Sequence, residues 1–401
     1  MSYPFSERLD RFSPSASIAA KTRAAALQAT GVSVLEFCSG EPDFVTPAAI
    51  IDAASSAAHE GQTHYTATTG TKALKAAVQR KFKRDNGLEF AADEIIVSSG
   101  AKQMIYTAFT CTVDRGDEVI IPAPYWVSYP DIVKLCEGVP VIVECPDTQG
   151  FKLTAEQLEA AITPRTKWLV LNTPNNPTGA IYSHDELKAL TDVLLRHPHV
   201  WLMTDEIYEH LNYAGATLAA PTVIAPVLKS RTLVINGVSK AYAMTGWRIG
   251  FGGAPAALVR VMDKLMSQSI GGASSVSQAA AVAALDGGGE FLRHAAEVFA
   301  GRRDLILSLL NEVPGLSCRP IEGAFYAYPN CSGLIGKQTP DGKVLNTDVD
   351  VRDYLLESAH VALLDGAAYG LSPYLRLSFA TSNEIIIEGC RRIKEACQAL
   401  K

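Results

Sequence analysis

The sequence predicts an α/β protein with one large, mostly parallel sheet and a smaller α+β unit. Three observations lead to this prediction. The chain has 401 residues, more than one small core accommodates. Between about residues 94 and 253, short apolar runs alternate with segments of helical length, as in a sheet covered on both faces. After about residue 290 this alternation ends, and shorter elements follow.

Seven apolar runs are the expected strands of the large sheet. Each is short, continuous and bounded by turn-forming or helical residues, as expected for strands buried on both faces. Helix-length segments between them include 102–113, 154–161 and 183–196. The expected strands are 94–98, 118–121, 139–144, 167–172, 200–204, 232–236 and 248–252.

The sequence pattern after about residue 290 predicts the smaller α+β unit. Its central stretch contains Gly, Lys and Pro and is expected to be a loop. We find no internal repeat and no low-complexity segment. The expected elements are a helix at 290–311, the aromatic segment 325–328, the loop 332–346, a helix at 350–360, strands near 361–364 and 375–378, and an amphipathic helix from Ser382.

Composition excludes several functional classes. Hydrophobic residues make up 48% and charged residues 19%, as in ordinary globular enzymes. A net charge of -6 without a basic run argues against nucleic acid as a partner. The eight cysteines show no CxxC pair and no metal-ligand spacing, so no bound metal is expected. Scattered cysteines of this kind are typical of small buried hydrophobic residues in a reducing compartment. Residues 1–8 have no signal-peptide core, and no apolar run of about 18 residues could span a membrane, which favours a cytoplasmic protein.

The most informative segment is 239–250, which reads SKAYAMTGWRIG and follows the expected strand 232–236. Lys240, at the end of a buried strand, is placed to form a Schiff base with a carbonyl, and burial would keep more of it neutral. Arg248 offers a planar fork of donors suited to a phosphate. An aldehyde and a phosphate together describe pyridoxal 5'-phosphate (PLP). For an isolated Ser-Lys, a solvated surface lysine and a rim arginine are the alternative.

Several other motifs also follow expected strands. Gly100, the segment 172–179, Asp205 and Lys240 each come after one. Because ligands collect at the carboxyl ends of parallel strands, these motifs are expected to share one site. Gly100 opens a helix whose first amide groups can receive a phosphate. Asp205 supplies the buried carboxylate that a pyridinium nitrogen requires, with a helix N-cap as the alternative.

SKAYAMTGWRIG resembles the cofactor-lysine motif of class I aminotransferases, which are PLP enzymes of fold type I. The resemblance runs from about Pro14 to Gln398 and is closest to bacterial aspartate and prephenate aminotransferases. It implies a large PLP-binding domain at 46–290 and a small domain made of 1–45 and 291–401. The motifs that carry it most densely are 40–44, 98–103, 124–129, 172–179 and 204–208.

The resemblance implies roles around the PLP ring. Lys240 is the implied Schiff-base lysine and the base that moves the proton. Asp205 is implied as the pyridinium partner and Tyr208 as a donor to the phenolic oxygen. Trp126 is implied to stack on the ring, with an ordinary core tryptophan as the alternative. Asn176 is implied to contact both the phenolic oxygen and the substrate. Its segment, 172–179, contains two prolines and is expected from its composition to be a loop.

The resemblance also implies how the phosphate is held. Gly100 and Ala101 contribute backbone groups, Arg248 its guanidinium and Ser239 a hydroxyl. Tyr65 matches a tyrosine that reaches across a subunit interface to the phosphate of the neighbouring chain. A homodimer with composite active sites is therefore implied.

Substrate contacts are implied at Gly40, Trp126, Asn176 and Arg376. Arg376 matches the arginine that pairs with the α-carboxylate, with a surface salt bridge as the alternative. The sequence departs from the family in two places. Asp365 stands where relatives often have proline, and segment 267–275 lacks the side-chain-binding arginine of some aspartate aminotransferases. Lys102, Ser15 and Ser17 are the candidates for reading the substrate side chain instead.

The implied activity is a ping-pong transamination through a Lys240 Schiff base and pyridoxamine phosphate. The implied amino donor is aspartate or a related acidic L-amino acid, and the acceptor is a 2-oxo acid such as 2-oxoglutarate. A prephenate aminotransferase would share this machinery, and a PLP-dependent β-lyase is possible on the same scaffold. A PLP-binding regulator would need an attached DNA-binding domain, for which a chain beginning with the aminotransferase segment has no room.

Overall fold

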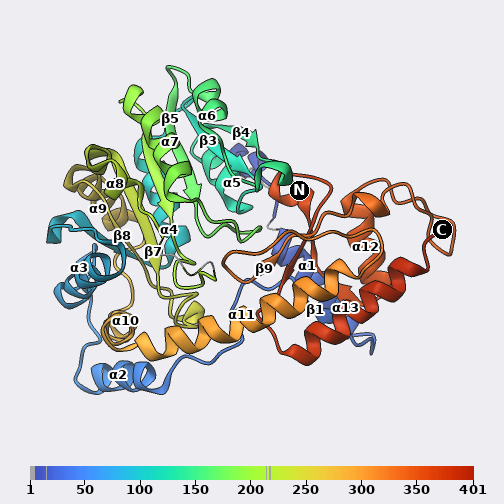
Figure 1. The fold of residues 1–401 in the computed structure, drawn as a ribbon. Coiled ribbons are helices and arrows are strands. Elements are labelled where there is room, and N and C mark those ends of the chain that lie inside the picture. The colour runs from blue at the N-terminus through green and yellow to red at the C-terminus, as the bar shows by residue number, and fades with distance from the viewer. Residues whose placement is uncertain (1–4, 15, 214, 216–217) are drawn as a thin grey trace.

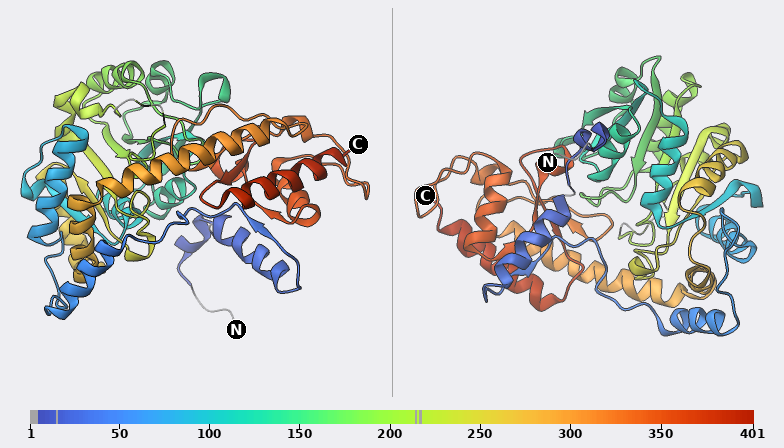
Figure 2. Two further views of the ribbon diagram at one scale, coloured as in Figure 1. Left: turned by 60° about the horizontal axis from the view of Figure 1, so that its bottom comes forward. Right: turned by 180° about the vertical axis from the view of Figure 1, so that it is seen from behind.

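The computed structural model describes residues 5–14, 16–213, 215 and 218–401. Figure 1 shows a large sheet flanked by helices and a smaller group of helices and strands formed mainly by the C-terminal part of the chain. The long helix α11 (Gly289–Asn311) runs from one part to the other (Figures 1 and 2). None of the described helices is long and apolar enough to cross a membrane.

The large sheet has seven strands in the order β2-β8-β7-β6-β5-β3-β4. β8 is antiparallel to both of its neighbours, and the other strands pair in parallel, so the prediction of a mostly parallel sheet is confirmed. β7 and β8 are joined without a long crossover helix, which parallel neighbours would need. The strands are β2 (Ile95–Ser98), β3 (Glu118–Ala123), β4 (Val139–Glu144), β5 (Thr166–Asn172), β6 (Trp201–Asp205), β7 (Thr232–Gly237) and β8 (Gly250–Gly253).

Most strand boundaries differ from the sequence prediction by one or two residues, and two of these differences move a candidate site residue. The strand expected at 248–252 begins only at Gly250, because Arg248 has a φ of 57° and ends the short 3-10 helix η5 (Thr245–Trp247). A left-handed residue cannot continue a strand. β6 is shifted by one residue, so Asp205 is the last residue of the strand and does not follow it.

Helices cover both faces of the large sheet. Along β3, Val119 packs into a cluster with Met104 of α4, whereas Ile120 packs with Leu190 of α7 on the opposite face. This alternation follows from the two-residue period of a strand. The helices around the sheet are α2 (Ala48–His59), α3 (Lys72–Asn86), α4 (Ala101–Thr112), α5 (Ser128–Leu135), α6 (Ala155–Ala161), α7 (His184–Arg196), α8 (Pro221–Ile224), α9 (Ala256–Ser269) and α10 (Ser275–Gly287).

The smaller part is built on two short sheets. One has the antiparallel order β11-β12-β9, and the other pairs β1 with β10 in parallel. The strand expected at 361–364 is therefore two strands that belong to different sheets. The elements are α1 (Ala16–Gln28), β1 (Leu35–Glu36), β9 (Tyr326–Ala327), α12 (Asp348–Ser358), β10 (Val361–Ala362), β11 (Leu364–Asp365), β12 (Leu375–Ser378) and α13 (Asn383–Gln398).

The N-terminal segment lies against this smaller part. Leu35 pairs with Val361, and the Phe37 carbonyl accepts a hydrogen bond from the Ser378 amide at 2.8 Å. Figure 2 shows α1 beside the C-terminal elements in both views. The domain limits at 45/46 and 290/291 stay a prediction.

Short 3-10 helices complete the fold. The loop expected at 332–346 contains one of them and an isolated bridge between Gln338 and Val344. The 3-10 helices besides η5 are η1 (Glu7–Arg11), η2 (Ala92–Glu94), η3 (Asp147–Gln149), η4 (Pro226–Arg231), η6 (Ser332–Leu334) and η7 (Gly366–Tyr369).

Candidate active site

A cavity of about 330 Å³ lies at the carboxyl ends of β5 and β6 and beside the turn after β7, facing the smaller part of the molecule. We call it the substrate cavity. It is lined by every predicted site residue except Gly100 and Tyr65. These residues are Gly40, Ala101, Trp126, Asn176, Asp205, Tyr208, Ser239, Lys240, Arg248 and Arg376.

Lys240 lies in the turn that follows β7. Its ammonium Nζ donates a hydrogen bond to the carbonyl oxygen of Gly40 at 2.7 Å. Burial lowers the pKa of this lysine to about 8. Glu41 opposes this shift, and Arg248 adds to it. The structure therefore holds an amine that loses its proton far more easily than a free lysine, and the surface-lysine alternative is wrong.

Asp205 ends β6 as a buried carboxylate. Its Oδ2 accepts a hydrogen bond from the Tyr129 hydroxyl at 2.6 Å, and its Oδ1 accepts one from the Ile207 amide at 3.3 Å. Burial raises the pKa of Asp205, while the Tyr129 bond lowers it. The turn at 207–210 is not a helix, so the N-cap alternative is wrong.

The start of α4 and Arg248 form one corner of the substrate cavity. Gly100 has a φ of 87°, and a Cβ there would lie 2.4 Å from a guanidinium nitrogen of Arg248. A larger residue would push the arginine away from the helix start. Arg248 also donates to the Thr245 carbonyl at 2.9 Å. Ala101 and the buried Ser239 line the same cavity.

Aromatic rings form the walls. The Trp126 ring packs edge-on against Tyr129, with centroids 5.2 Å apart, and the Lys102 ammonium lies 4.9 Å from the Trp126 ring centroid. The hydroxyl groups of Tyr208 and Tyr326 are 2.8 Å apart. A planar ligand in this cavity therefore meets one aromatic face and a pair of phenol groups.

Arg376 reaches the substrate cavity from β12. It is buried, donates to the Cys38 carbonyl at 2.9 Å and to the Asn176 side-chain oxygen at 3.2 Å, and its Nε has no hydrogen-bond partner. Its guanidinium carbon lies 4.4 Å from the Tyr326 ring centroid. Within the described ranges no carboxylate pairs with Arg376, so the surface salt-bridge alternative is wrong.

Tyr129, Tyr326 and Lys21 are among the further residues that line the cavity and to which the sequence assigned no role. Lys21 stands four residues after Ser17 on α1, and residues at this spacing share one helix face, so the helical period was an available signal. The tyrosine contacts depend on packing between distant segments and had no such signal.

The predicted side-chain readers divide into described and undescribed residues. Lys102 and Ser17 lie on the wall of the cavity, whereas Ser15 lies outside the described residues. The segment 267–275 covers the end of α9 and the start of α10 and does not line the cavity.

Tyr65 and Asp365 lie away from the cavity of their own chain. Tyr65 is fully exposed, and its predicted contact with a neighbouring chain stays a prediction. Asp365 is buried, forms an ion pair with Arg352 and accepts a hydrogen bond from the Ala368 amide at 3.0 Å. Asp365 therefore stabilises the start of η7.

The fold and the cavity agree with the comparisons with known proteins. Residues 32–393 match the family model described as aminotransferase class I and II. The chain belongs to this aminotransferase family. The predicted transaminase activity and the predicted membership of the class I group are thereby confirmed.

Named relatives match the aminotransferase over nearly its full length. This chain is 53% identical to an aspartate aminotransferase of Rhizobium meliloti strain 1021, and the matched region covers 94% of this chain and 92% of the relative. It is 50% identical to an aspartate/prephenate aminotransferase of Cereibacter sphaeroides, covering 98% and 99%.

Solved structures confirm the fold type I architecture. The crystal structure of the Rhizobium meliloti aspartate aminotransferase superimposes with a TM-score of 0.98 at 50% identity and covers all of both chains. The Thermus thermophilus aspartate aminotransferase with maleate gives a TM-score of 0.92 at 37% identity, covering 98% of this chain and 100% of that one.

Proposed function

We propose that the aminotransferase works with PLP bound in the substrate cavity and transfers the amino group of an acidic L-amino acid to a 2-oxo acid. The observation that carries this proposal is the convergence of Lys240, Asp205 and Arg248 on one cavity. An amine, a buried carboxylate and a guanidinium there match the aldehyde, the ring nitrogen and the phosphate of PLP.

The residues present fit this cofactor. Gly100 leaves the space in which Arg248 lies over the start of α4, and Ala101 begins the helix whose first amide groups attract a phosphate. Asp205 is buried, and among the described residues Tyr129 alone donates a side-chain hydrogen bond to it. Its other oxygen accepts a long hydrogen bond from the Ile207 amide and has a further lone pair for a pyridinium nitrogen. Trp126 would cover the ring, and Ser239 would add a hydroxyl.

When bound, PLP withdraws electrons from the substrate Cα. The protein's part is to hold the reactants and move the proton. Lys240 Nζ has a pKa of about 8 and can accept a proton from Cα and return one to the cofactor carbon. Asp205 would face the ring nitrogen and favour its protonated form, and Tyr208 would donate to the phenolic oxygen. Arg376, held by Asn176, binds the α-carboxylate through its two-pronged guanidinium.

Two lysines at the cavity wall support an acidic amino donor. Lys102 and Lys21 line the same cavity as Arg376, and Ser17 adds a hydroxyl on the same helix as Lys21. Lys21 also pairs with Glu41 at 3.5 Å. We propose that these groups bind the second carboxylate, with aspartate as the donor and 2-oxoglutarate as the acceptor. Prephenate as an acceptor is a second candidate, because the Cereibacter sphaeroides relative is named for both substrates.

We also propose a cytoplasmic homodimer with two domains, 46–290 and 1–45 with 291–401. Tyr65 is fully exposed in its own chain, which leaves its ring free for the contact with a second chain that the family resemblance implies. Arg248 is likewise exposed although it lines the cavity, which leaves room for a group from a second chain. Sedimentation of a fully active monomer would contradict the dimer.

The cofactor is tested by spectroscopy. Protein purified with PLP is expected to absorb in the visible range, and borohydride reduction should fix PLP on Lys240, which peptide mass spectrometry identifies. Lys240→Ala should lose that absorbance and that modified peptide. Modification of another lysine with full retention of activity would overturn the assignment.

The substrate is tested with a panel. Aspartate, glutamate and apolar donors are each combined with 2-oxoglutarate, oxaloacetate and prephenate, and product keto acids are measured. Turnover of aspartate with 2-oxoglutarate is expected. L-Cysteine, which carries a thiol leaving group on Cβ, is added without any keto-acid acceptor. Release of pyruvate, ammonia and sulfide from it, without turnover of aspartate, would indicate β-elimination and contradict the proposal.

A further inference from the structure

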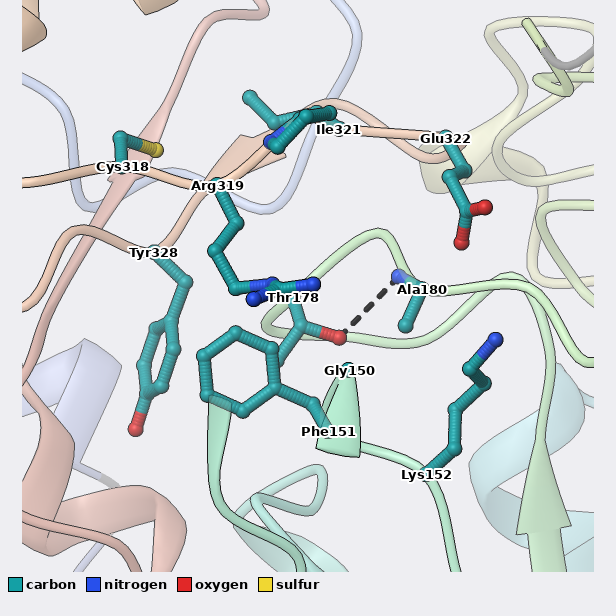
Figure 3. A pocket seen from close by; sticks show the side chains of 11 residues that line it. Gly150, Phe151, Lys152, Thr178, Ala180, Cys318, Arg319, Ile321, Glu322 and Tyr328 are labelled. Atoms are coloured by element: carbon teal, nitrogen blue, oxygen red, sulfur yellow. Dashed lines mark hydrogen bonds between the residues drawn. The ribbon is translucent and has the colours of Figure 1, made fainter. Parts of the chain in front are cut away.

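A second cavity, of about 210 Å³, lies away from the substrate cavity (Figure 3). Three segments surround it: 150–152 after η3, 178–180 in the loop after β5, and 318–322 between α11 and β9. None of its lining residues lines the substrate cavity. Its volume is below the range usual for drug-sized ligands and suits one small molecule. We call it the 319–322 cavity.

The 319–322 cavity contains one cation and one anion without ionic partners. The Arg319 side chain extends into it (Figure 3), and across the described part of the chain this arginine forms no hydrogen bond or ion pair. Glu322 accepts one hydrogen bond, from the Ile181 amide at 3.0 Å, and pairs with no cation among the described residues. Lys152 does not compensate it, because its ammonium pairs with Glu186 at 2.7 Å.

The remaining wall of the cavity is apolar and includes a strained residue. Phe151 has a φ of 60°, a conformation that costs a non-glycine residue about 1 kcal/mol or more. Its ring packs edge-on against Tyr328, with centroids 5.6 Å apart, and against Tyr374 at 5.4 Å. This strained backbone conformation places the aromatic ring of Phe151 in the cavity wall, together with Ile321.

We propose that the 319–322 cavity is an effector site for a small α-amino acid with an apolar side chain. The carboxylate of such a zwitterion pairs with the guanidinium fork of Arg319, and its ammonium pairs with the Glu322 carboxylate. The side chain packs against Phe151 and Ile321. A ligand with both charges satisfies both unpaired groups, which an anion or a cation alone does not.

The effector site shares a loop with the substrate cavity. Thr178 in the wall of the 319–322 cavity donates to the Asn175 side-chain oxygen at 2.9 Å and accepts from the Ala180 amide at 3.1 Å. Asn176, in the same loop, holds Arg376. The Glu322 carboxylate accepts a hydrogen bond from the Ile181 amide, directly after this segment of the loop. A ligand that fixes Glu322 therefore stabilises the loop conformation in which Arg376 is positioned. Effector binding therefore lowers the KM for the amino donor, and by linkage the donor strengthens effector binding.

The binding test uses L-leucine and calorimetry on PLP-loaded Arg376→Ala protein, in which the substrate cavity has lost its carboxylate grip. L-leucine is expected to bind, and adding Arg319→Gln or Glu322→Gln should weaken binding at least tenfold. The matched control is Arg260→Gln, which removes an exposed arginine on α9 that lines no described cavity and has no described partner. Absence of binding, or equal binding by the Arg319→Gln variant, would overturn the proposal.

The ligand class is tested with two analogues of leucine. 4-Methylpentanoate lacks the ammonium group and 3-methylbutylamine lacks the carboxylate, so each should bind at least tenfold more weakly than leucine. Equal binding of either analogue would overturn the zwitterion assignment. These measurements need no turnover, so they remain informative even if the proposed transamination fails.

The effector role is tested by steady-state kinetics of the wild-type protein. Saturating L-leucine should lower the KM for the amino donor at least twofold, and this change should be lost in Arg319→Gln and kept in Arg260→Gln. Leucine that binds only in the substrate cavity would raise the KM equally in all three proteins. That result, or an unchanged KM, would overturn the effector role.

Discussion

The substrate cavity and a polar cluster made of Lys81, Asn86 and Glu209 each hold a lysine away from solvent, but the partners of the two ammonium groups differ. In the cavity, Lys240 contacts a carbonyl oxygen at 2.7 Å and is flanked by the positive charge of Arg248. In the cluster, Lys81 of α3 is almost completely buried, forms an ion pair with Glu209, and donates to the Asn86 side-chain oxygen at 2.6 Å. The two lysines differ in whether a carboxylate touches the ammonium.

This difference separates a reactive lysine from a structural one. Burial without a counter-ion disfavours the charged form, and the pKa of Lys240 falls to about 8. Burial also opposes the charge on Glu209, but Lys81 and His210 outweigh it and lower the pKa of that carboxyl. The cluster stays charged and joins α3 to the turn that carries Tyr208.

The largest expected effect is at Lys240. Lys240→Ala should lower kcat/KM by about 10⁴-fold or more, because the amine that moves the proton is gone. Its unfolding midpoint should change little, since the lysine makes one hydrogen bond. Single-turnover kinetics and thermal unfolding measure the two effects. Retention of a tenth of the activity would contradict the catalytic assignment.

Lys81→Met should instead destabilise the fold. It leaves Glu209 charged and buried without its cation, which costs about 3–5 kcal/mol of unfolding free energy. Urea unfolding measures this loss. The double variant Lys81→Met with Glu209→Gln serves as the control and should recover more than half of it, whereas an equally unstable double variant would show that the ion pair is not the cause.

Arg376→Lys tests the second cation of the substrate cavity. Loss of the two-pronged donor should lower kcat/KM, by an amount that corresponds to roughly 2–4 kcal/mol of lost transition-state stabilisation. The affinity for PLP should stay nearly unchanged. Every amino donor should suffer equally, because all carry an α-carboxylate. If only dicarboxylate donors were affected, Arg376 would be the reader of the side chain, and Lys102→Ala is the variant that should show that selective pattern.

Glu206, three residues before Glu209 of the Lys81–Glu209 pair, should make the unfolding free energy depend on pH. Burial, with Glu209 adding to it, raises the pKa of Glu206 to about 8. The folded state therefore binds a proton that the unfolded chain releases near pH 4.5, and the stability from this group is lost as the pH rises from about 4.5 through 8. Glu206→Gln removes this loss. The stability of the variant relative to wild type should therefore rise by about 4 kcal/mol between pH 5 and pH 8.5.

Urea unfolding at these two pH values checks the Glu206 effect. Glu156→Gln is the control, because Glu156 lies on the exposed first turn of α6 and its carboxyl is ionised across this range. A stability difference between the Glu206→Gln variant and wild type that does not vary with pH would contradict the assigned titration.

The smallest expected effect is on the rate at which cofactor-free protein captures PLP. Only the neutral Lys240 amine attacks an aldehyde, so a pKa of about 8 makes the rate rise about tenfold between pH 7 and pH 9. Stopped-flow absorbance measures it. A rate that continues to rise steeply through pH 10 would indicate the pKa of an ordinary exposed lysine.

Local sequence patterns were sufficient for much of the fold. Thr154 and Ser183 each cap a helix with a glutamine or glutamate three residues later, and both helices occur where the sequence predicts them. The strand at 139–144 is found unchanged as β4. These signals work because caps and strand periodicity involve residues close together in the chain.

Family resemblance added the candidate site residues, and the structure brings most of them to one cavity. The sequence could not place Tyr129 on Asp205 or Tyr326 beside Tyr208, because these contacts join segments 76 and 118 residues apart. It also placed Arg248 in a strand, whereas packing over Gly100 holds it in a left-handed turn.

The sequence by itself therefore determined the α/β class, the strand-end positions of the motifs and the chemistry that the lysine and arginine suggest. Only the tertiary structure decided which groups are buried and which charges are paired. Lys240 meets Gly40, and Arg376 meets Asn176, each across 200 residues of chain. Burial and charge pairing depend on such contacts, so the lowered pKa of Lys240 and the unpaired charges of the 319–322 cavity follow from the packing of the whole chain.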